Sequence, residues 1–291
     1  MPHTRHGPRR IWLCADDYGI SPGVNAGIRE LIARGRLNAT SVMVAAPHLG
    51  KDEAAALAQL NRSEKRVAIG LHVTLTAPFR PLTGNFSPLH LGAFQSLGKK
   101  MRAAITRRLQ PDTLVAEIAA QLRAFQDTFG EPPDFVDGHQ HVHLFPQVRD
   151  AFVKVVAELA PTAWVRQCGR ANSLRRLHDR KALVLDILSM AFRRRAERQG
   201  LATNPAFAGS YAFTPKAKFA QIFPRFLTGL PDGGLVMCHP GFVDAALESL
   251  DSLTTLREHE FAYFNSDAFP QALAKHGVAL AQPAGNSGAA A

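Results

Sequence analysis

The sequence predicts an α/β fold built on a parallel sheet or barrel. Short apolar runs alternate with longer amphipathic segments along the chain, which is typical of parallel strands joined by helices. Four of the apolar runs lead into aspartate or histidine, and the carboxyl ends of parallel strands meet at one edge of a sheet or one rim of a barrel. Of the 291 residues, 46% are hydrophobic and 20% charged, which is enough for a sizeable core in one large domain or two small ones.

The first elements have clear start and stop signals. Residues 11–15 form a short apolar run between polar residues, which predicts a buried strand. Ser21 and Pro22 fit a helix N-cap followed by proline in the first turn, and Gly35 ends that helix. Similar patterns predict a strand over residues 41–45, a helix over 53–60 and a strand over 67–71.

The middle of the chain combines a long loop with two amphipathic helices. Residues 77–100 contain proline, glycine, asparagine and serine, which predicts a long irregular loop. Apolar residues at spacings of three and four predict a helix over residues 114–129. The elements expected after it are a short strand at 135–136, a helix between Pro146 and Pro161, and a strand at 163–165.

Residues 174–200 interrupt this alternation with a basic segment. Arginine and lysine residues flank an apolar stretch over residues 182–192. A basic helix with an apolar middle can lie on an anionic membrane surface, although the same pattern is typical of a core helix with solvated ends. The elements expected after it are a loop over 201–214, a strand over 234–238, a helix from a capping box at Thr255 and Glu258 to Phe264, a helix ending near Gly277 and a strand over 278–280.

The composition indicates which classes of partner and which cellular location to expect. A net charge of +10, from 34 basic and 24 acidic residues, favours anionic partners, although ordinary surface charge also explains it. The three cysteines, Cys14, Cys168 and Cys238, make neither a disulfide framework nor a CxxC pair. The apolar run after the basic N-terminus is too short for a signal peptide, and no run reaches transmembrane length, so we expect a cytoplasmic protein.

A histidine cluster follows the strand at 135–136. Its sequence is Asp137-Gly138-His139-Gln140-His141-Val142-His143, so three of the twelve histidines fall within five positions. Imidazole is the commonest metal-ligand side chain and the usual proton-transfer group near neutral pH. Taken alone, the cluster also fits a solvated loop or histidines that cap the core.

Other strand ends carry reactive side chains as well: Asp16 and Asp17, His72, and His239. One carboxylate and two imidazoles can hold a catalytic metal ion and leave a position open for water. A second carboxylate beside the metal can act as general base, and a histidine across the site can act as general acid. Taken singly, the two aspartates also fit a helix-capping turn, and His72 also fits a core histidine.

These motifs resemble the YdjC-like carbohydrate deacetylases, a family that includes chitooligosaccharide deacetylases and hopanoid-biosynthesis deacetylases. The resemblance spans about residues 11–280 and rests on segments 15–21 (ADDYGIS), 70–72 (GLH), 137–143 (DGHQHVH) with Phe145-Pro146, and 239–241 (HPG). It implies a deformed (β/α) TIM-like barrel and metal-dependent removal of an N-acetyl group from an amino sugar, oligosaccharide or sugar-bearing lipid, with release of acetate. We therefore expect one catalytic domain over residues 11–281 with an insert near 174–214, a flexible tail at 1–10 and a disordered tail at 282–291.

The resemblance also implies a role for each residue of the site. One divalent metal ion, zinc or magnesium first and manganese, iron or nickel as alternatives, would be held by Asp17, His72 and His139. Asp16 would be the general base and His239 the general acid. Arg166, directly after the strand at 163–165, would orient the base or bind substrate, unless it only forms a structural ion pair. His141 and His143 would hydrogen-bond to the metal ligands, unless one of them is itself the ligand in place of His139.

The substrate and the class of activity have alternatives. The arginine-rich segment 175–198 is more similar to the hopanoid-associated branch, which implies a glycolipid substrate and a peripheral membrane contact through this segment. Another metal-dependent amidase or phosphoesterase would use the same chemistry at the rim. A basic, non-catalytic protein that binds nucleic acid or membranes is the third alternative. The chain contains no familiar nucleic-acid recognition motif, so we expect no nucleic-acid partner; the oligomeric state is left open.

Overall fold

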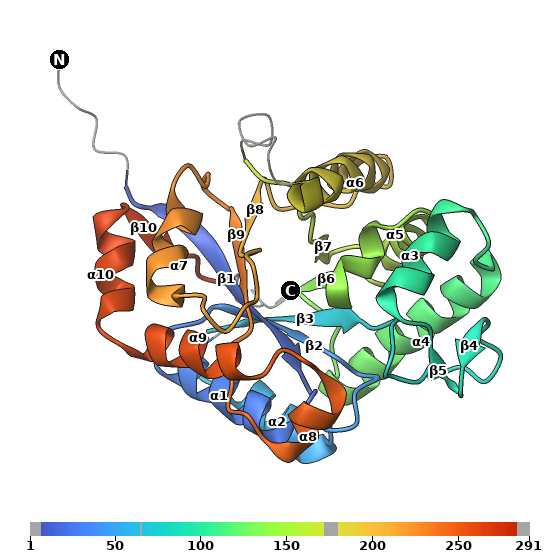
Figure 1. The fold of residues 1–291 in the computed structure, drawn as a ribbon, viewed down its shortest axis with the longest axis horizontal. Helices are drawn as coiled ribbons and strands as arrows, with labels where there is room; N and C mark the ends of the chain where they lie inside the picture. The colour runs from blue at the N-terminus through green and yellow to red at the C-terminus, as the bar shows by residue number, and fades with distance from the viewer. Residues whose placement is uncertain (1–6, 65, 172–179, 284–291) are drawn as a thin grey trace, which may run out of the picture.

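A curled parallel sheet forms the centre of the molecule. The computed structural model describes residues 7–64, 66–171 and 180–283 (Figure 1). The sheet has eight strands in the order β7-β6-β3-β2-β1-β9-β8, with β10 paired to the beginning of β1, and all of its pairings are parallel. The strands are β1 (Arg9–Tyr18), β2 (Ala39–Val42), β3 (Ala68–Val73), β6 (Phe135–Gly138), β7 (Trp164–Val165), β8 (Phe207–Ala208), β9 (Leu235–Cys238) and β10 (Val278–Leu280).

The two edges of this sheet approach each other. An isolated parallel bridge between Val165 and Thr203 joins the β7 edge to the segment that leads into β8. The sheet therefore curls into an irregular barrel, which confirms the predicted α/β class and its deformed-barrel form.

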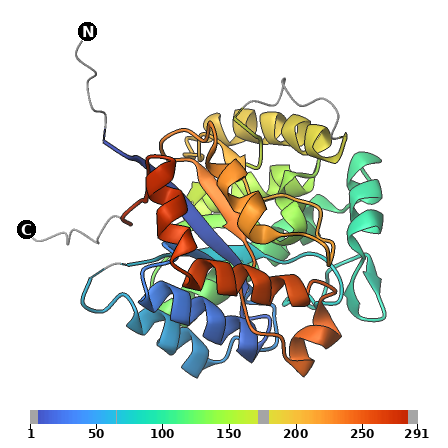
Figure 2. The same ribbon diagram turned by 60° about the vertical axis from the view of Figure 1, so that its left-hand side comes forward.

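Helices pack around the outside of the sheet (Figures 1 and 2). They are α1 (Pro22–Ala33), α2 (Lys51–Gln59), α4 (Pro111–Phe129), α5 (Val148–Leu159), α6 (Arg180–Glu197), α7 (Phe219–Leu227), α8 (Ala245–Leu250), α9 (Thr255–Asn265) and α10 (Ala268–Lys275). The predicted signals of the first helix are confirmed: the Ser21 hydroxyl accepts from the Val24 amide, Pro22 occupies the first turn, and Gly35 has a φ of +66° just beyond the end. Among the described residues, no helix has the length and apolar character needed to cross a membrane.

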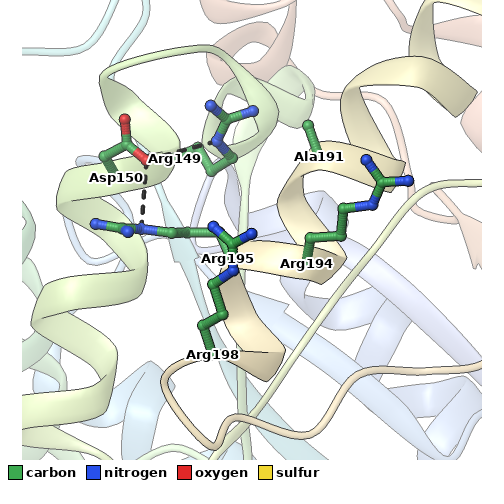
Figure 3. A pocket seen from close by; sticks show the side chains of 6 residues that line it. All are labelled: Arg149, Asp150, Ala191, Arg194, Arg195 and Arg198. Atoms are coloured by element: carbon green, nitrogen blue, oxygen red, sulfur yellow. Dashed lines mark ion pairs between the residues drawn. The ribbon is translucent and has the colours of Figure 1, made fainter.

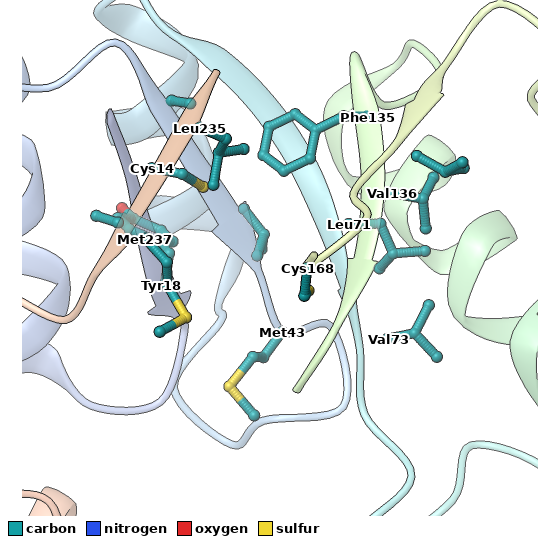
Figure 4. Close-up of a cluster of buried hydrophobic side chains, with 14 of the residues drawn as sticks. Cys14, Tyr18, Met43, Leu71, Val73, Phe135, Val136, Cys168, Leu235 and Met237 are labelled. Atoms are coloured by element: carbon teal, nitrogen blue, oxygen red, sulfur yellow. The ribbon is translucent and has the colours of Figure 1, made fainter. Parts of the chain in front are cut away.

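Buried apolar side chains from neighbouring strands form the core (Figure 4). Phe135 of β6 stacks on Trp164 with 4.4 Å between ring centroids, and a Cβ atom at Gly70 of β3 would lie 2.5 Å from the Phe135 ring. Glycine at position 70 thus lets β3 and β6 pack closely, and truncating Phe135 to alanine would cost about 3–5 kcal/mol. The register of these two strands sets His72 opposite Asp137, so the core directly positions two polar residues at the strand ends.

The region at residues 77–100 is more ordered than predicted. It contains a hairpin of β4 (Leu89–His90) and β5 (Ala93–Phe94), followed by α3 (Leu97–Ile105). The hairpin turns through Leu91 and Gly92, both with positive φ, and its two-residue strands are too short to show an alternating pattern. The prediction of an irregular loop is therefore wrong for residues 89–100.

Several other boundaries differ from the sequence predictions. The β1 strand begins at Arg9, inside the segment expected to be a tail, because the Arg9 guanidinium donates to backbone carbonyls at the ends of α7 and α10. The β8 strand lies within the expected loop 201–214, and the patterns give no expectation for α7 and α8.

The predicted capping box is wrong: α9 starts at Thr255, its N-cap is Thr254, and Glu258 instead accepts from the Val243 amide. Residues 1–6, 172–179 and 284–291, Arg175 and Arg176 among them, lie outside the described residues.

Candidate active site

Reactive side chains meet at the carboxyl ends of the strands. Going from β1 through β3, β6 and β7 to β9, these side chains are Asp16 and Asp17, His72, Asp137 and His139, Arg166, and His239. The last of them is half-buried and the others are buried. Their placement follows from the parallel topology, because each strand ends at the same rim.

Asp16 and Asp17 face different partners because the backbone leaves the extended conformation between them. Asp17 has a φ of 71°, in the left-handed region that aspartate tolerates better than most residues. The pairing of β1 with β2 shifts register between Ala15 and Tyr18, where the two aspartates lie. Two adjacent carboxylates can therefore serve separate tasks.

Asp17, His72 and His139 form a compact group of potential metal ligands. Asp17 Oδ1 lies 3.0 Å from His139 Nδ1 and 3.4 Å from His72 Nε2, and one ligand atom from each residue lies within 4.8 Å of the others. The second oxygen of Asp17 and the second ring nitrogen of His72 contact residues outside this group. Arg257 Nη2 donates to Asp17 Oδ2 at 2.7 Å, and His72 Nδ1 lies 2.5 Å from Asp137 Oδ1. This donor set of one carboxylate and two imidazoles fits a catalytic divalent-metal site with an open position.

Arg166 lies between two buried carboxylates. Its Nη1 and Nη2 atoms donate to Asp16 Oδ1 and Oδ2, both at 2.7 Å, and Nη2 also lies 2.8 Å from Asp137 Oδ2. Burial alone would raise the pKa of Asp16, but the charges of Arg166 and His72 outweigh it and hold the pKa well below its usual range. Cys14, Asp16 and Asp137 are also close enough to share a cation, and the fully buried Arg166 guanidinium is the cation already paired with both carboxylates.

The charges around His72 favour a cation in the site. Burial alone would lower the pKa of His72, yet the carboxylates of Asp137 and Asp16 raise it to about 10. Burial would also raise the pKa of Asp17, but Arg257 and His139 hold it well below its ordinary value. An ionised carboxylate beside an imidazole of high basicity will bind either a proton or a metal ion.

His239 is fixed mainly through its backbone. The His239 amide donates to Glu260 Oε2, and the Tyr211 hydroxyl donates to Glu260 Oε1, both at 2.6 Å. The His239 ring packs edge-on against Phe213, and its Nδ1 atom has no hydrogen-bond partner in the described part of the chain. Burial lowers the pKa of His239, although the carboxylates of Asp17 and Asp16 oppose the shift.

The structure gives His141 and His143 other partners than the metal-ligand group. His143 Nε2 donates to the Arg166 carbonyl at 2.8 Å, and its ring packs against Phe152 and Phe192. His141 Nδ1 lies 3.5 Å from Cys168 Sγ. The candidate ligands have other partners: Asp137 accepts from His72, and Arg257 donates to Asp17.

A family model described as YdjC-like protein matches residues 10–275 of the chain. The chain belongs to the YdjC-like family. Similar curated proteins include the chitooligosaccharide deacetylases of Citrobacter koseri and Proteus mirabilis, each 30% identical to this YdjC-like chain. The alignments cover 94% of this chain and 97% of the first relative, and 91% and 94% for the second.

Solved structures share the fold of this YdjC-like protein. A provisionally named cellobiose-phosphate cleavage protein of Enterococcus faecalis aligns with a TM-score of 0.74 and 18% identity, covering 95% of this chain and 98% of that one. A lactam utilization protein of Thermus thermophilus aligns with a TM-score of 0.50 and 15% identity, covering 93% and 98%. At these identities the likeness is one of fold.

Two functional candidates in this YdjC-like site lie on a helix rather than at a strand end. Arg257 and Glu260 belong to α9 and are almost completely buried. Arg257 bridges Asp17 and Asp251, and Glu260 holds the His239 amide. The signal that could have found Glu260 is its place among Leu256, Tyr263 and Phe264, because a carboxylate within a buried helical stripe needs partners.

Proposed function

We propose that this YdjC-like protein is a metal-dependent carbohydrate N-deacetylase, which hydrolyses the acetamido group of an amino sugar and releases acetate. The observation that carries the proposal is the convergence of Asp17, His72 and His139 beside Asp16, an ionised carboxylate that is not one of the three ligands. The names of the chitooligosaccharide deacetylases at 30% identity support an N-acetylated sugar as the substrate.

The metal ligands in this proposal are Asp17, His72 and His139, with zinc or magnesium as the first candidates. The fit rests on their donor atoms, which lie within 4.8 Å of one another, and on the partners that hold the opposite sides of Asp17 and His72. When bound, a divalent ion lowers the pKa of a coordinated water and polarises the acetyl carbonyl, so that a weakly basic carboxylate suffices to accept the proton.

Asp16 acts as the general base, and Arg166 positions it. The bidentate contact fixes both oxygens of Asp16 and keeps the carboxylate ionised, which is the form that accepts a proton. Because Arg166 is fully buried and contacts Asp16 and Asp137, it serves the base rather than the substrate. Asp137 has the corresponding task at His72: it fixes the ring so that Nε2 faces Asp17.

His239 acts as the general acid for the leaving amine. Glu260 and Tyr211 fix the backbone of this residue, so its ring can turn toward the substrate without losing its anchor. Protonation of the amine needs the imidazolium form, and the negative charge of Asp16 and Asp17 favours that form against the effect of burial.

The substrate is a soluble N-acetylated oligosaccharide or a sugar-bearing lipid. The relatives' names favour the soluble sugar. The basic segment 175–198 favours the lipid, and its described part, α6, carries apolar side chains on its surface. The corresponding membrane contact and the cytoplasmic location stay predictions.

Acetate release from N-acetylated oligosaccharides and glycolipids tests the proposal, on protein of measured metal content with and without a chelator. Chelator-sensitive release supports it, and the preferred substrate distinguishes the soluble sugar from the lipid. If metal-loaded protein releases no acetate from any of these substrates, the proposal is wrong and another amide or a phosphate ester becomes the better candidate.

The variant Asp16→Asn tests the role of the base. We expect it to keep its metal and to lose about 10²–10⁴-fold in turnover, because the amide cannot accept the proton of the water. Asp112→Asn, at an exposed aspartate in the first turn of α4, is the matched control and should retain full activity. A metal-loaded Asp16→Asn protein with wild-type turnover would refute the assignment.

A further inference from the structure

We propose that a cavity between α5 and α6 binds a phosphate-class oxyanion. The cavity has a volume of about 310 Å³ and is lined by Arg149, Asp150, Ala191, Arg194, Arg195 and Arg198 (Figure 3). This volume falls at the lower end of the range for small-molecule sites. No lining residue belongs to the candidate active site, so the proposal goes beyond the deacetylase reaction.

The cavity is strongly positive. Four arginines line it together with a single carboxylate, that of Asp150, whose Oδ1 lies 3.7 Å from Arg149 Nε and 3.5 Å from Arg195 Nε. Among the described residues, the side chains of Arg194 and Arg198 have no ion-pair or hydrogen-bond partner. Like charges that line one cavity repel one another, and a bound anion reduces that repulsion.

Two arginines of the cavity also have unused hydrogen-bond donors. The Nε atoms of Arg149 and Arg195 are buried and have no hydrogen-bond partner within the described ranges, since the contacts to Asp150 are too long. Oxyanions of phosphorus offer acceptor oxygens in the geometry that guanidinium groups prefer. Arg149 lies in the first turn of the twelve-residue helix α5, where the helix dipole adds to the positive potential.

The surface of α6 beside the cavity indicates which kind of phosphate could bind, a phospholipid headgroup or a free phosphate. Val184, Ile187 and Met190 precede the cavity arginines along this helix and are 51%, 54% and 53% exposed. Apolar side chains next to a basic pocket suit the acyl chains and headgroup of an anionic phospholipid. The arginine cavity alone suits a free phosphate or a small phosphorylated molecule, so both sources enter the test.

Binding of phosphate by the full-length protein tests the proposal. Inorganic phosphate and pyrophosphate are titrated calorimetrically at constant ionic strength, with metal-loaded and chelator-treated protein. Sedimentation with phosphatidylcholine vesicles, with and without phosphatidic acid, examines the lipid source. We expect the double variant Arg194→Gln/Arg198→Gln to bind at least about tenfold more weakly than wild type. The matched control Arg123→Gln/Arg193→Gln removes the same charge outside the cavity and should bind like wild type.

The possible results distinguish a free phosphate from a lipid headgroup, and three of them would overturn the proposal. Variant-sensitive binding of free phosphate supports a soluble oxyanion, and variant-sensitive binding of phosphatidic acid vesicles without free phosphate supports a lipid headgroup. Equal weakening by both double variants would show unspecific attraction to a basic protein and overturn the proposal. Phosphate binding that is lost with the chelator would point to the active-site metal and overturn it as well, as would the absence of binding to either probe.

Discussion

Replacing Asp137 by asparagine should weaken metal binding through the tautomer of His72. Arg166 Nη2 lies 2.8 Å from Asp137 Oδ2 and can only donate, so the oxygen of an asparagine at this position must face Arg166. Its amide group then faces His72 Nδ1, which lies 2.5 Å from the present carboxylate. An amide donates where the carboxylate accepted, so His72 must accept at Nδ1 and carry its proton on Nε2. That is the atom facing Asp17, and a protonated Nε2 cannot bind a metal.

The expected loss of metal affinity follows from the contact between His72 and Asp137. Loss of a carboxylate partner behind a metal-bound histidine costs about 10–100-fold in metal affinity, or about 1.4–2.7 kcal/mol. We expect Asp137→Asn near the upper end, because the substitution reverses the hydrogen bond instead of only removing it. Metal affinity is measured by competition with a chelating dye, and the unfolding midpoint of each variant confirms that the protein folds.

Ser41 provides a matched control at the same ring nitrogen. Its hydroxyl lies 3.0 Å from His72 Nδ1 and 3.2 Å from Asp16 Oδ1, and a hydroxyl can either donate or accept. Ser41→Ala therefore leaves the tautomer of His72 under the control of Asp137, and we expect less than about a threefold loss of metal affinity. Equal affinities for Asp137→Asn and Ser41→Ala would refute the reasoning.

Three further predictions concern the other buried charges. Arg166→Met should lower the free energy of unfolding by about 3–5 kcal/mol in a denaturant titration, because two buried carboxylates lose their guanidinium; an unchanged midpoint would contradict this. Burial raises the pKa of Glu260 from 4.5 to about 7, against the hydrogen bonds from Tyr211 and His239. The folded protein therefore holds a proton between these pH values that the unfolded chain has released, so this residue makes wild type less stable as pH rises from 4.5 to 7, by at most about 3 kcal/mol. Glu260→Gln should lack that decline, and parallel denaturation curves at about pH 5 and about pH 8 check whether the difference between the two proteins changes with pH. His239→Asn should impair release of acetate from an acetamido sugar about 10²-fold or more and from p-nitrophenyl acetate much less, because nitrophenolate leaves without a proton; equal losses on both substrates would exclude the acid role.

The strand-end residues could be predicted because short apolar runs mark the strands and apolar spacings of three and four mark the helices between them. Apolar runs separated by amphipathic helices identify parallel strands, and parallel topology brings Asp16, His72 and His239 to one rim even though they are far apart in sequence. The resemblance also implies separate roles for Asp16 and Asp17. The left-handed backbone of Asp17 gives the two carboxylates different partners, Arg166 for Asp16 and Arg257 for Asp17.

The partners of these residues could not be predicted in the same way. Arg257 reaches Asp17 from α9, and no local pattern connects two residues 240 positions apart. The role of Asp137 depends on the register of β3 against β6, which is set by the packing of Phe135 over Gly70 rather than by any signal within the cluster. The β8 strand has only two residues, so it carries no periodicity at all.

The ion pair between Arg257 and Asp17 has a consequence for folding during synthesis on the ribosome. Asp17 leaves the ribosome 240 residues ahead of the arginine that neutralises it. Until translation has passed α9, the growing chain can form β1 only without the guanidinium partner of Asp17, so this end of β1 gains its native environment late. A messenger truncated before residue 257 would thus encode most of the barrel without the partner that holds Asp17 in place.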